Sequence, residues 1–392
     1  MHIRNPRGYK SKYDMVIERL TLHNFKNYEF LDMSVAQGFH CFFGHNGAGK
    51  TNLLDSIYYL CMTKSYFGLN DMAVVRKGTD AMRLAATVRR DGQEERFVAR
   101  VAPRKLKVFE RQEVPYERLA EHIGILPVVM IAPDDTELLT DGSEARRRFL
   151  DNTLSQMDGR YLMELMRYNR ILQQRNALLR QMSEHHTRDS GLIEAYTQPL
   201  IAAARYLFEC RSRFMGAFSE IFHQKYQAIS RTAERATLAY RSALQQQDIG
   251  DLLKQTLEKD LLLLRTTEGI HRDDLECLIE EVPVRRFASQ GQRKSFLIAL
   301  KLAQYEILRS AKGFSPILLL DDLYDKLDPD RVAQLFQLLH APDMGQVFLT
   351  DTQGARIAPM LLEQGRACSF FQIFKEGHTA FATQISHYEK RQ

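Results

Sequence analysis

The segment from Gly44 to Thr51 constrains this chain more than any other feature. It reads Gly-His-Asn-Gly-Ala-Gly-Lys-Thr and matches the pattern G-x-x-x-x-G-K-[ST]. The short apolar run over 39–43 before it predicts a strand, and the spacing of apolar residues over 51–62 after it predicts a helix. A strand, a glycine loop and a helix in this order form the context in which the pattern binds nucleotide phosphates.

The residue types of this loop explain the chemistry we expect from it. Glycines let the backbone curl so that successive N–H groups point at phosphate oxygens, and the start of the helix adds a positive dipole end. We expect Lys50 to bridge the β- and γ-phosphates of ATP and Thr51 to offer its hydroxyl to Mg²⁺. The predicted nucleotide-binding residues here are Gly44, His45, Asn46, Gly47, Ala48, Gly49, Lys50, Thr51 and Asn52.

A second motif consists of four apolar residues, 317–320, followed by Asp321 and Asp322. A fully apolar run of this length is typical of a strand buried on both faces of a parallel sheet. The strand would carry Asp321 to the sheet edge beside the phosphate loop, where the carboxylate could hold Mg²⁺ through water. Asp322 could position the attacking water. We therefore predict Thr51 and Asp321 as metal residues and Lys50 and Asp322 as catalytic residues.

A third motif, Ser-Gln-Gly-Gln at 289–292, precedes an amphipathic helix predicted over 295–308. It resembles the S-x-G-Q signature of ABC-type ATPases. The resemblance implies that Ser289, Gly291 and Gln292 bind the γ-phosphate of ATP held by a second copy, so that ATP would join two copies into a homodimer. Leu327-Asp328 fits the D-loop, which this family places at the dimer seam.

Further segments narrow the resemblance to the RecF family, whose heads are similar to those of SMC proteins. Residues 24–28 read N-F-K-N-Y, residues 146–151 read R-R-R-F-L-D, residues 269–275 read G-I-H-R-D-D-L, and residues 287–293 read F-A-S-Q-G-Q-R. Ile270 stands where the family has proline. The similarity runs in motif order from about Met15 to the end of the chain.

The resemblance implies both a fold and a function. The fold would be an α/β ABC/SMC-type P-loop ATPase head with an inserted helical arm lobe. The function would be that of an ATP-dependent DNA-binding protein of recombinational repair and replication restart. Such a protein dimerises on ATP and promotes RecA loading at single-strand gaps together with RecO and RecR. Its expected cofactors are ATP and Mg²⁺, and its expected DNA is duplex or a single-strand/double-strand junction.

The order of predicted elements agrees with a head interrupted by an insertion. Strand patterns occur at both ends of the chain, including an antiparallel meander over 84–109. Two long helical stretches, over 143–182 and 192–230, predict an αα-hairpin joined by a polar tip. We divide the chain into three segments. They are the N-terminal part of the ATPase lobe over 15–142, a helical lobe over 143–265, and the C-terminal part of the ATPase lobe over 266–392.

Three departures from the ABC pattern bear on hydrolysis. No glutamine lies between Val128 and Thr140, where ABC ATPases place a Q-loop ligand, and residues 350–352 read Thr-Asp-Thr where a switch histidine is expected. Asp322 stands where the usual catalytic residue is glutamate. A shorter carboxylate and no switch histidine predict slow hydrolysis, stimulated by DNA and serving as a switch. Whether the chain is an enzyme in its own right is left open.

Charge gives a diffuse indication of DNA binding. Lys and Arg exceed Asp and Glu by 54 to 49 over the 392 residues, which gives a net charge of +5. Between Arg83 and Lys107, eight basic residues face three acidic ones. Phosphate contacts need surface charge without a particular spacing, so any single basic residue is more often simply solvated. Candidate DNA-contacting residues are those basic residues together with Arg146, Arg147, Arg148, Arg167, Arg170, Arg175 and Arg180.

Two alternatives from other classes share part of these motifs. The nucleotide-binding subunit of an ABC transporter would need a Q-loop glutamine and a switch histidine, and a small-molecule P-loop kinase would not need the segment at 289–292. No apolar run is long enough to span a membrane, and the five cysteines are scattered, so we expect a cytoplasmic, nucleoid-associated protein without a membrane partner. Residues 1–14 lack the apolar core of a signal peptide, and whether they belong to the native start is left open.

Overall fold

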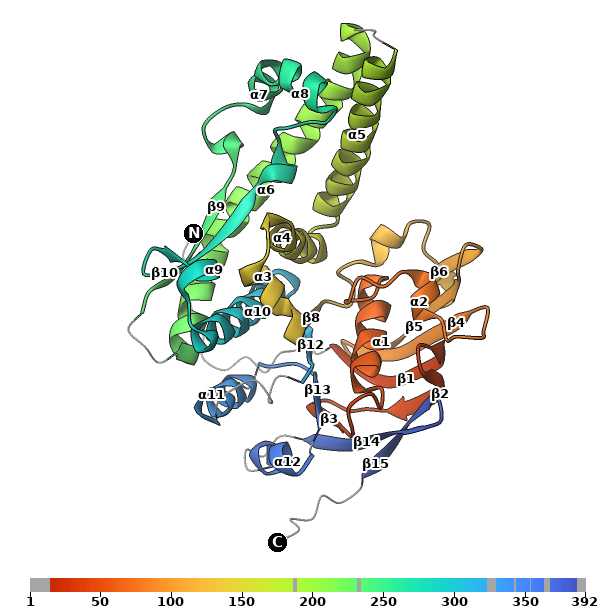
Figure 1. The fold of residues 1–392 in the computed structure, drawn as a ribbon. Helices are drawn as coiled ribbons and strands as arrows, with labels where there is room; N and C mark the ends of the chain where they lie inside the picture. Colours follow the sequence, from red (N-terminus) through yellow and green to blue (C-terminus); the bar gives the residue numbers. More distant parts are fainter. Residues whose placement is uncertain are drawn as a thin grey trace. The chain divides into compact units, whose positions relative to one another are not determined.

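The computed structural model describes residues 15–185, 189–230, 234–322, 329–341, 343–352, 354–362 and 367–385. The chain forms two compact units. The first combines the residues up to 134 with those from 304 onward, and the second consists of residues 135–303. Figure 1 labels their helices and strands, and each unit is described by itself below.

The first sheet of the first unit is antiparallel, with the order β2-β1-β4-β5-β6-β7. It contains the predicted meander, in which β4 pairs with β5 and β5 with β6. The strand at the start of the chain is confirmed, whereas the sequence analysis did not predict β2 or β7. The bounds are β1 Met15–Phe25, β2 Tyr28–Ser34, β4 Met82–Arg90, β5 Gln93–Ala102, β6 Leu106–Arg111 and β7 Val114–Pro115.

The second sheet of this unit has the order β15-β14-β3-β13-β12-β8 and is parallel from β14 to β8. Strand β13 lies between β3, which precedes the glycine loop, and β12, which precedes Asp321. The carboxyl ends of parallel strands share one sheet edge, so this order brings the two motifs together. The bounds are β3 Phe39–Phe43, β8 Val128–Ile131, β12 Ile317–Leu320, β13 Val347–Asp351, β14 Cys368–Glu376 and β15 Thr379–Ile385.

Helix α1, Lys50–Met62, lies between the two sheets (Figure 1). Every residue from Leu53 to Met62 is buried, including the carboxylate of Asp55, which pairs with Lys26 Nζ at 2.6 Å. A helix covered on all sides is fixed in place by its packing, and so is the loop that leads into it. The other helices of this unit are α2 Asp71–Val74, α11 Pro329–Leu339, α12 Gly354–Leu362 and the 3-10 turn Leu119–His122.

The second unit is mainly helical. Its long antiparallel pair, α5 and α6, is the predicted αα-hairpin. The stretch predicted over 143–182 is two helices, α4 and α5, and Asp158 caps the start of α5. A three-stranded sheet has the order β11-β10-β9. The bounds are α3 Glu137–Thr140, α4 Ser143–Met157, α5 Gly159–Glu184, α6 Ser190–Ser230, β9 Ala236–Arg241, α7 Ile249–Gln255, α8 Leu257–Leu263, β10 Asp274–Ile279, β11 Val282–Pro283 and α9 Val284–Phe287, with 3-10 turns at Ala243–Gln245 and Ile270–Arg272. Helix α10, Gln290–Lys312, begins in this unit and ends in the first, and the 3-10 turn Pro133–Thr136 begins in the first and ends in this one.

The two units divide the chain at other points than the three segments predicted from sequence. Residues 266–303, which we assigned to the ATPase lobe, cluster with the helical unit. The reason is strand pairing, because β10 pairs with β9 along its whole length. The assignment of functions to the three segments stays a prediction.

Candidate nucleotide-binding site

The glycine loop has a backbone that glycine alone adopts without strain at two positions that matter. Gly44 has φ 155° and Gly49 has φ 121°. A Cβ at Gly44 would lie 2.1 Å from the carbonyl oxygen of Ile373, and one at Gly49 would lie 2.7 Å from Nδ2 of Asn27. Neighbouring atoms of the same chain therefore leave no room for a side chain at Gly44 or Gly49. The loop is held in the curled conformation that the motif predicts.

Lys50 is 4% exposed although it begins helix α1. Its Nζ donates to the carbonyl oxygens of Gly44 at 2.9 Å and His45 at 3.2 Å. The side chain thus folds back over the loop, and its ammonium lies beside two of the loop's carbonyl oxygens. This is the placement expected of a cation that neutralises nucleotide phosphates.

Asn27 and Tyr28 brace the loop from strand β2 and the turn before it. Nδ2 of Asn27 donates to the carbonyl oxygen of Ala48 at 3.2 Å, and the Tyr28 hydroxyl donates to that of Gly49 at 3.1 Å. Asn52 Nδ2 in turn donates to Oδ1 of Asn27 at 2.8 Å. Asn27 and Tyr28 were quoted for the family resemblance without a role, whereas Asn52 was predicted to bind the nucleotide. The segment N-F-K-N-Y was the signal that could have found them.

The two aspartates after β12 occupy the sheet edge beside the loop. Thr51 Oγ1 donates to Oδ1 of Asp321 at 3.0 Å, so the structure brings the two predicted metal residues together. Thr350, at the end of β13, donates its hydroxyl to Oδ1 of Asp321 at 2.8 Å. The same hydroxyl oxygen accepts the backbone N–H of Asp322 at 2.9 Å. Thr350 therefore connects both carboxylate residues, a role that the sequence analysis missed.

The electrostatics of Asp321 suit a cation ligand. Burial raises the pKa of Asp321 to about 6, and the charge of Asp322 acts in the same direction, whereas the hydroxyls of Thr350 and Thr51 lower it. A hydroxyl and a carboxylate are hard oxygen donors of the kind Mg²⁺ prefers. In the parts of the chain that the structure describes, no group of three or more His, Cys, Asp or Glu side chains could hold a metal. An Mg²⁺ bound here would thus take its other ligands from phosphates and water.

The signature residues belong to the second unit. The Gln292 N–H donates to Oγ of Ser289 at 3.1 Å, and the Ser289 N–H donates to Oε1 of Gln292 at 2.7 Å. This reciprocal pair caps the start of helix α10. Ser289 is exposed, and Gly291 is half-buried in the first turn. An exposed helix start with a serine hydroxyl is suited to bind an anion from outside the chain.

The segment at 269–275 has a structural role in the second unit. Asp273 accepts from Arg211 Nη1 at 2.7 Å and from the Tyr240 hydroxyl at 2.5 Å, and His271 Nδ1 lies 2.7 Å from the Tyr168 hydroxyl. These contacts tie the segment to α5, α6 and β9.

Two predicted DNA-contacting residues belong to the same buried architecture and must be corrected. Arg146 is 8% exposed and pairs with Asp274 at 2.7 Å, and Arg175 is fully buried and pairs with Asp260 at 2.8 Å. Neither guanidinium is available to DNA. Arg148, Arg167, Arg170 and Arg180 are exposed. Leu327-Asp328, the predicted D-loop, lies outside the described residues.

Comparison with known proteins shows the family of this chain. The sequence model of the family described as RecF/RecN/SMC N terminal domain matches residues 16–360. The DNA replication and repair protein RecF of Flavobacterium johnsoniae is 38% identical over 361 residues, which cover 92% of this chain and 100% of that protein. RecF of Cytophaga hutchinsonii is 39% identical over 87% of this chain and 90% of its own length. These relatives give no support to the transporter alternative.

Solved structures show the same fold. A structure of the recombination mediator protein RecF with ATP, described as part of the RecFOR pathway, covers 98% of this chain and 100% of its own with a TM-score of 0.86 and 25% identity. The Smc head domain of Pyrococcus furiosus covers 95% and 96% with a TM-score of 0.56 and 16% identity, a likeness of fold alone. These matches confirm the predicted ABC/SMC-type head. A search of the described helices for one long and apolar enough to cross a membrane finds none.

Proposed function

Because the chain belongs to the RecF family of DNA replication and repair proteins, we propose that it is an ATP-dependent DNA-binding protein of recombinational repair. In this proposal it acts with RecO and RecR to promote RecA loading at single-strand gaps. The observation that carries the proposal is the convergence of Lys50, Thr51 and Asp321 at one sheet edge, with Thr51 Oγ1 3.0 Å from the Asp321 carboxylate.

In the proposed site the chain's own residues have separate tasks. The loop N–H groups and Lys50 bind the phosphates of ATP, and Thr51 and Asp321 would hold an Mg²⁺ that neutralises phosphate charge. Asp322 orients water for a slow hydrolysis that serves as a switch. Thr350 keeps both carboxylate residues in position.

ATP would also join two copies of the chain. Each exposed Ser289, at the start of α10 with Gly291 and Gln292, would contact the γ-phosphate held by Lys50 of the partner copy, as the ABC signature implies. If closure of this dimer favours DNA binding, DNA must favour closure to the same extent. DNA should therefore bind more tightly in the presence of ATP than of ADP.

The test is ATP-dependent dimerisation, measured by sedimentation velocity. Lys50→Met should abolish it by removing the cation that binds the phosphates. Ser289→Arg should keep ATP binding and lose dimerisation, because the bulky charge stands where the partner's γ-phosphate would lie. If Lys50→Met dimerises with ATP like the unmodified protein, the dimer proposal is wrong.

DNA binding is measured in the same samples with gapped, single-stranded and duplex DNA, each with ATP, ADP and no nucleotide. A kinase would turn over ATP with a small-molecule acceptor and would gain nothing from DNA. Turnover that responds to DNA, together with a dimer that forms only with ATP, supports the proposed function. Turnover that ignores DNA in a protein that stays monomeric would contradict it.

A further inference from the structure

The meander of β4, β5 and β6 carries an arginine-lined hollow on the face away from the core. Along β5, Phe97, Ala99 and Val101 are buried in the core of the first unit, so the alternate residues Arg96 and Arg100 lie on the other face. The hollow measures about 300 Å³. Its lining residues are Arg83, Arg96, Val98, Arg100, Glu110 and Glu113.

The strand register places like charges together in this hollow. Arg83 of β4 stands directly opposite Arg100 of β5, an arrangement that destabilises a sheet. Glu110 pairs with Arg100, and the largely exposed Glu113 lies 3.8 Å from Arg96. Arg83 makes neither a hydrogen bond nor a salt bridge with any described residue. Burial lowers the pKa of Arg83, and the charges of Arg96 and Arg100 lower it further.

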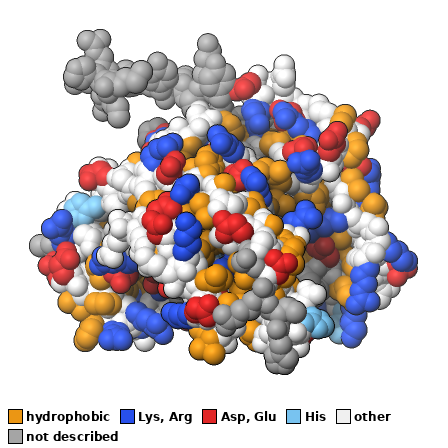
Figure 2. All heavy atoms as spheres, turned by 90° about the horizontal axis from the view of Figure 1, so that it is seen from above, with side chains coloured by type: hydrophobic (Ala, Val, Ile, Leu, Met, Phe, Trp, Pro, Cys, Tyr) orange, Lys and Arg blue, Asp and Glu red, His pale blue; other side chains and the backbone are white. Residues whose placement is uncertain are grey.

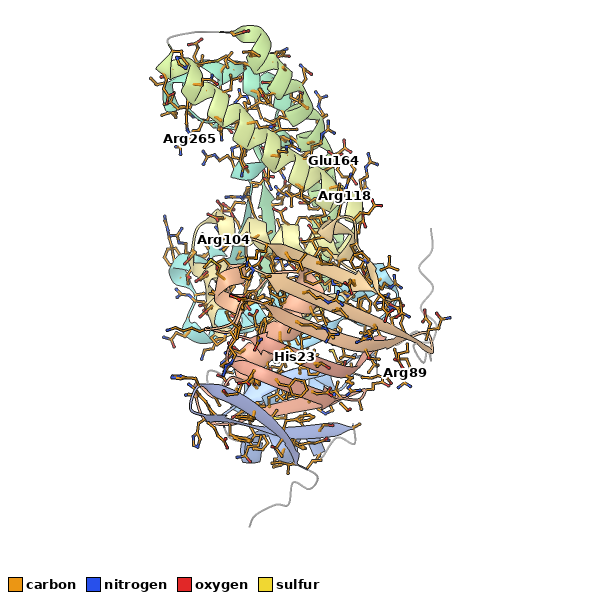
Figure 3. All side chains as sticks on the ribbon, turned by 90° about the vertical axis from the view of Figure 1, so that its right-hand side faces the viewer. His23, Arg89, Arg104, Arg118, Glu164 and Arg265 are labelled. Carbon is orange, nitrogen blue, oxygen red and sulfur yellow. The ribbon has the colours of Figure 1, made fainter. Side chains whose placement is uncertain are left out.

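The other basic residues between Arg83 and Lys107 either have partners within the fold or lie in the turn between β5 and β6. Three of them have partners within the fold, namely Arg89 with Glu18, Arg90 with the carbonyl oxygen of Ile125, and Lys107 with Asp71. Arg104 and Lys105 are exposed in the turn between β5 and β6. In Figure 3, which looks onto this side of the first unit, Arg104 and Arg89 lie at opposite ends of the meander. The cationic segment is thus reduced to one cluster, in which three arginines share two glutamates and Arg83 pairs with neither of them.

We propose that Arg83, Arg96 and Arg100 bind a backbone phosphate of DNA. A guanidinium presents paired donors that match phosphate oxygens, and one bound phosphate would offset the repulsion between Arg83 and Arg100. The assignment to DNA rests on the function proposed above. On the face drawn in Figure 2, Lys and Arg side chains are interspersed with Asp and Glu, so no broad single-sign patch marks a DNA surface there. A local cluster is therefore a sharper indicator than overall charge.

The test compares Arg83→Gln with Arg89→Gln in the full chain. Both remove one positive charge from the same sheet, but Arg89 already pairs with Glu18. Binding of a fluorescein-labelled gapped duplex with ATP is followed by anisotropy over a salt series. The Arg83→Gln protein should release one counter-ion fewer when it binds DNA. Its affinity for the DNA should therefore be about eightfold lower at about 0.1 M salt, and the slope of log affinity against log salt concentration should be shallower by about 0.9. The DNA affinity of Arg89→Gln and its dependence on salt should stay close to those of the unmodified protein.

Two controls separate the possible failures. Arg83→Gln should keep its ATP affinity and its thermal midpoint, because the substitution relieves repulsion instead of removing a bond. If Arg83→Gln binds DNA as tightly as the unmodified protein, the proposed phosphate site is wrong. The same holds if Arg89→Gln loses as much DNA affinity as Arg83→Gln. Neither result would contradict the proposal that the protein binds DNA. If the unmodified protein binds none of the DNAs, the proposed function fails as well. A poly-glutamate peptide that binds in an Arg83-dependent way, with DNA affinity unaffected, would overturn the assignment to DNA.

Discussion

At the scale of single residues, the hydroxyl of Thr350 connects the two aspartates at the edge of the parallel sheet. It donates to Asp321 and accepts from the backbone of Asp322, whose φ of 42° is unusual for an aspartate. A side chain with one donor and one acceptor fits both demands, and a histidine in its place could not reproduce this pair of short contacts. Thr350 thus orders both carboxylate residues from the neighbouring strand, in the segment where no switch histidine occurs.

Replacing Thr350 by valine keeps the shape of the side chain and removes both hydrogen bonds. We expect Mg²⁺-dependent ATP turnover to fall by about 10- to 100-fold, the usual effect of losing a partner behind a metal ligand, while ATP binding without Mg²⁺ changes little. Thr350→Ser restores the hydroxyl and should recover most of the turnover. Equal loss in both variants would show that Thr350 acts through packing alone.

At the scale of elements, helix α10 is held in the second unit by a buried ion pair. Lys301 Nζ lies 2.9 Å from Oδ1 of Asp135, and the two residues are 4% and 8% exposed. Asp135 belongs to the segment in which we found no Q-loop glutamine. The structure shows that this segment contributes an anchor for α10, which begins at the signature residues.

Removing one partner leaves the other charge buried without its counter-ion. Lys301→Met should lower the free energy of unfolding by about 3–5 kcal/mol, measured by urea denaturation. The double variant Lys301→Met, Asp135→Leu removes both charges and should recover most of that loss, because an apolar pair of similar volume is often neutral. A double variant as unstable as the single one would show that the pair is not the source of the effect.

At the scale of the whole molecule, both units contain neutral histidines, which are buried at positions 40 and 122 of the first unit and half-buried at position 271 of the second. Burial lowers the pKa of His40, His122 and His271 to about 4 from the usual 6.5. His122 donates from Nε2 to the carbonyl oxygen of Leu60 at 2.6 Å, which fits the neutral ring. The unfolded chain therefore binds more protons than the folded one between pH 6.5 and about 4, and protonation favours unfolding.

Because the unfolded chain binds more protons, the folded protein should lose stability as the pH falls from about 6.5 towards 4. A pKa displaced from 6.5 to about 4 corresponds to about 3 kcal/mol for one histidine. His122→Gln keeps a donor for the Leu60 carbonyl and cannot be protonated. Its thermal midpoint should therefore fall less than that of the unmodified protein between pH 7 and 5. If the thermal midpoints of the two proteins fall by the same amount over this pH range, protonation of His122 is not the cause of the loss of stability.

Sequence reasoning located the site because phosphate chemistry is local. The loop, its strand and its helix are contiguous in the sequence. A run of four apolar residues before two aspartates can be recognised without knowing which strands it pairs with. Strand β12 appears over the residues predicted for it. The strands β2, β14 and β15 were missed because their exposed faces interrupt the apolar pattern.

The sequence by itself determined the motifs, the family and the class of fold, since these depend on residue types at short spacing. Tertiary structure decided which distant groups meet. It placed β13 between β3 and β12, so that Thr350 reaches Asp321, and it buried Arg146 and Arg175 while leaving Arg83 opposite Arg100. The reason is that strand order, register and burial arise from packing between residues far apart in the chain, and no local pattern records them.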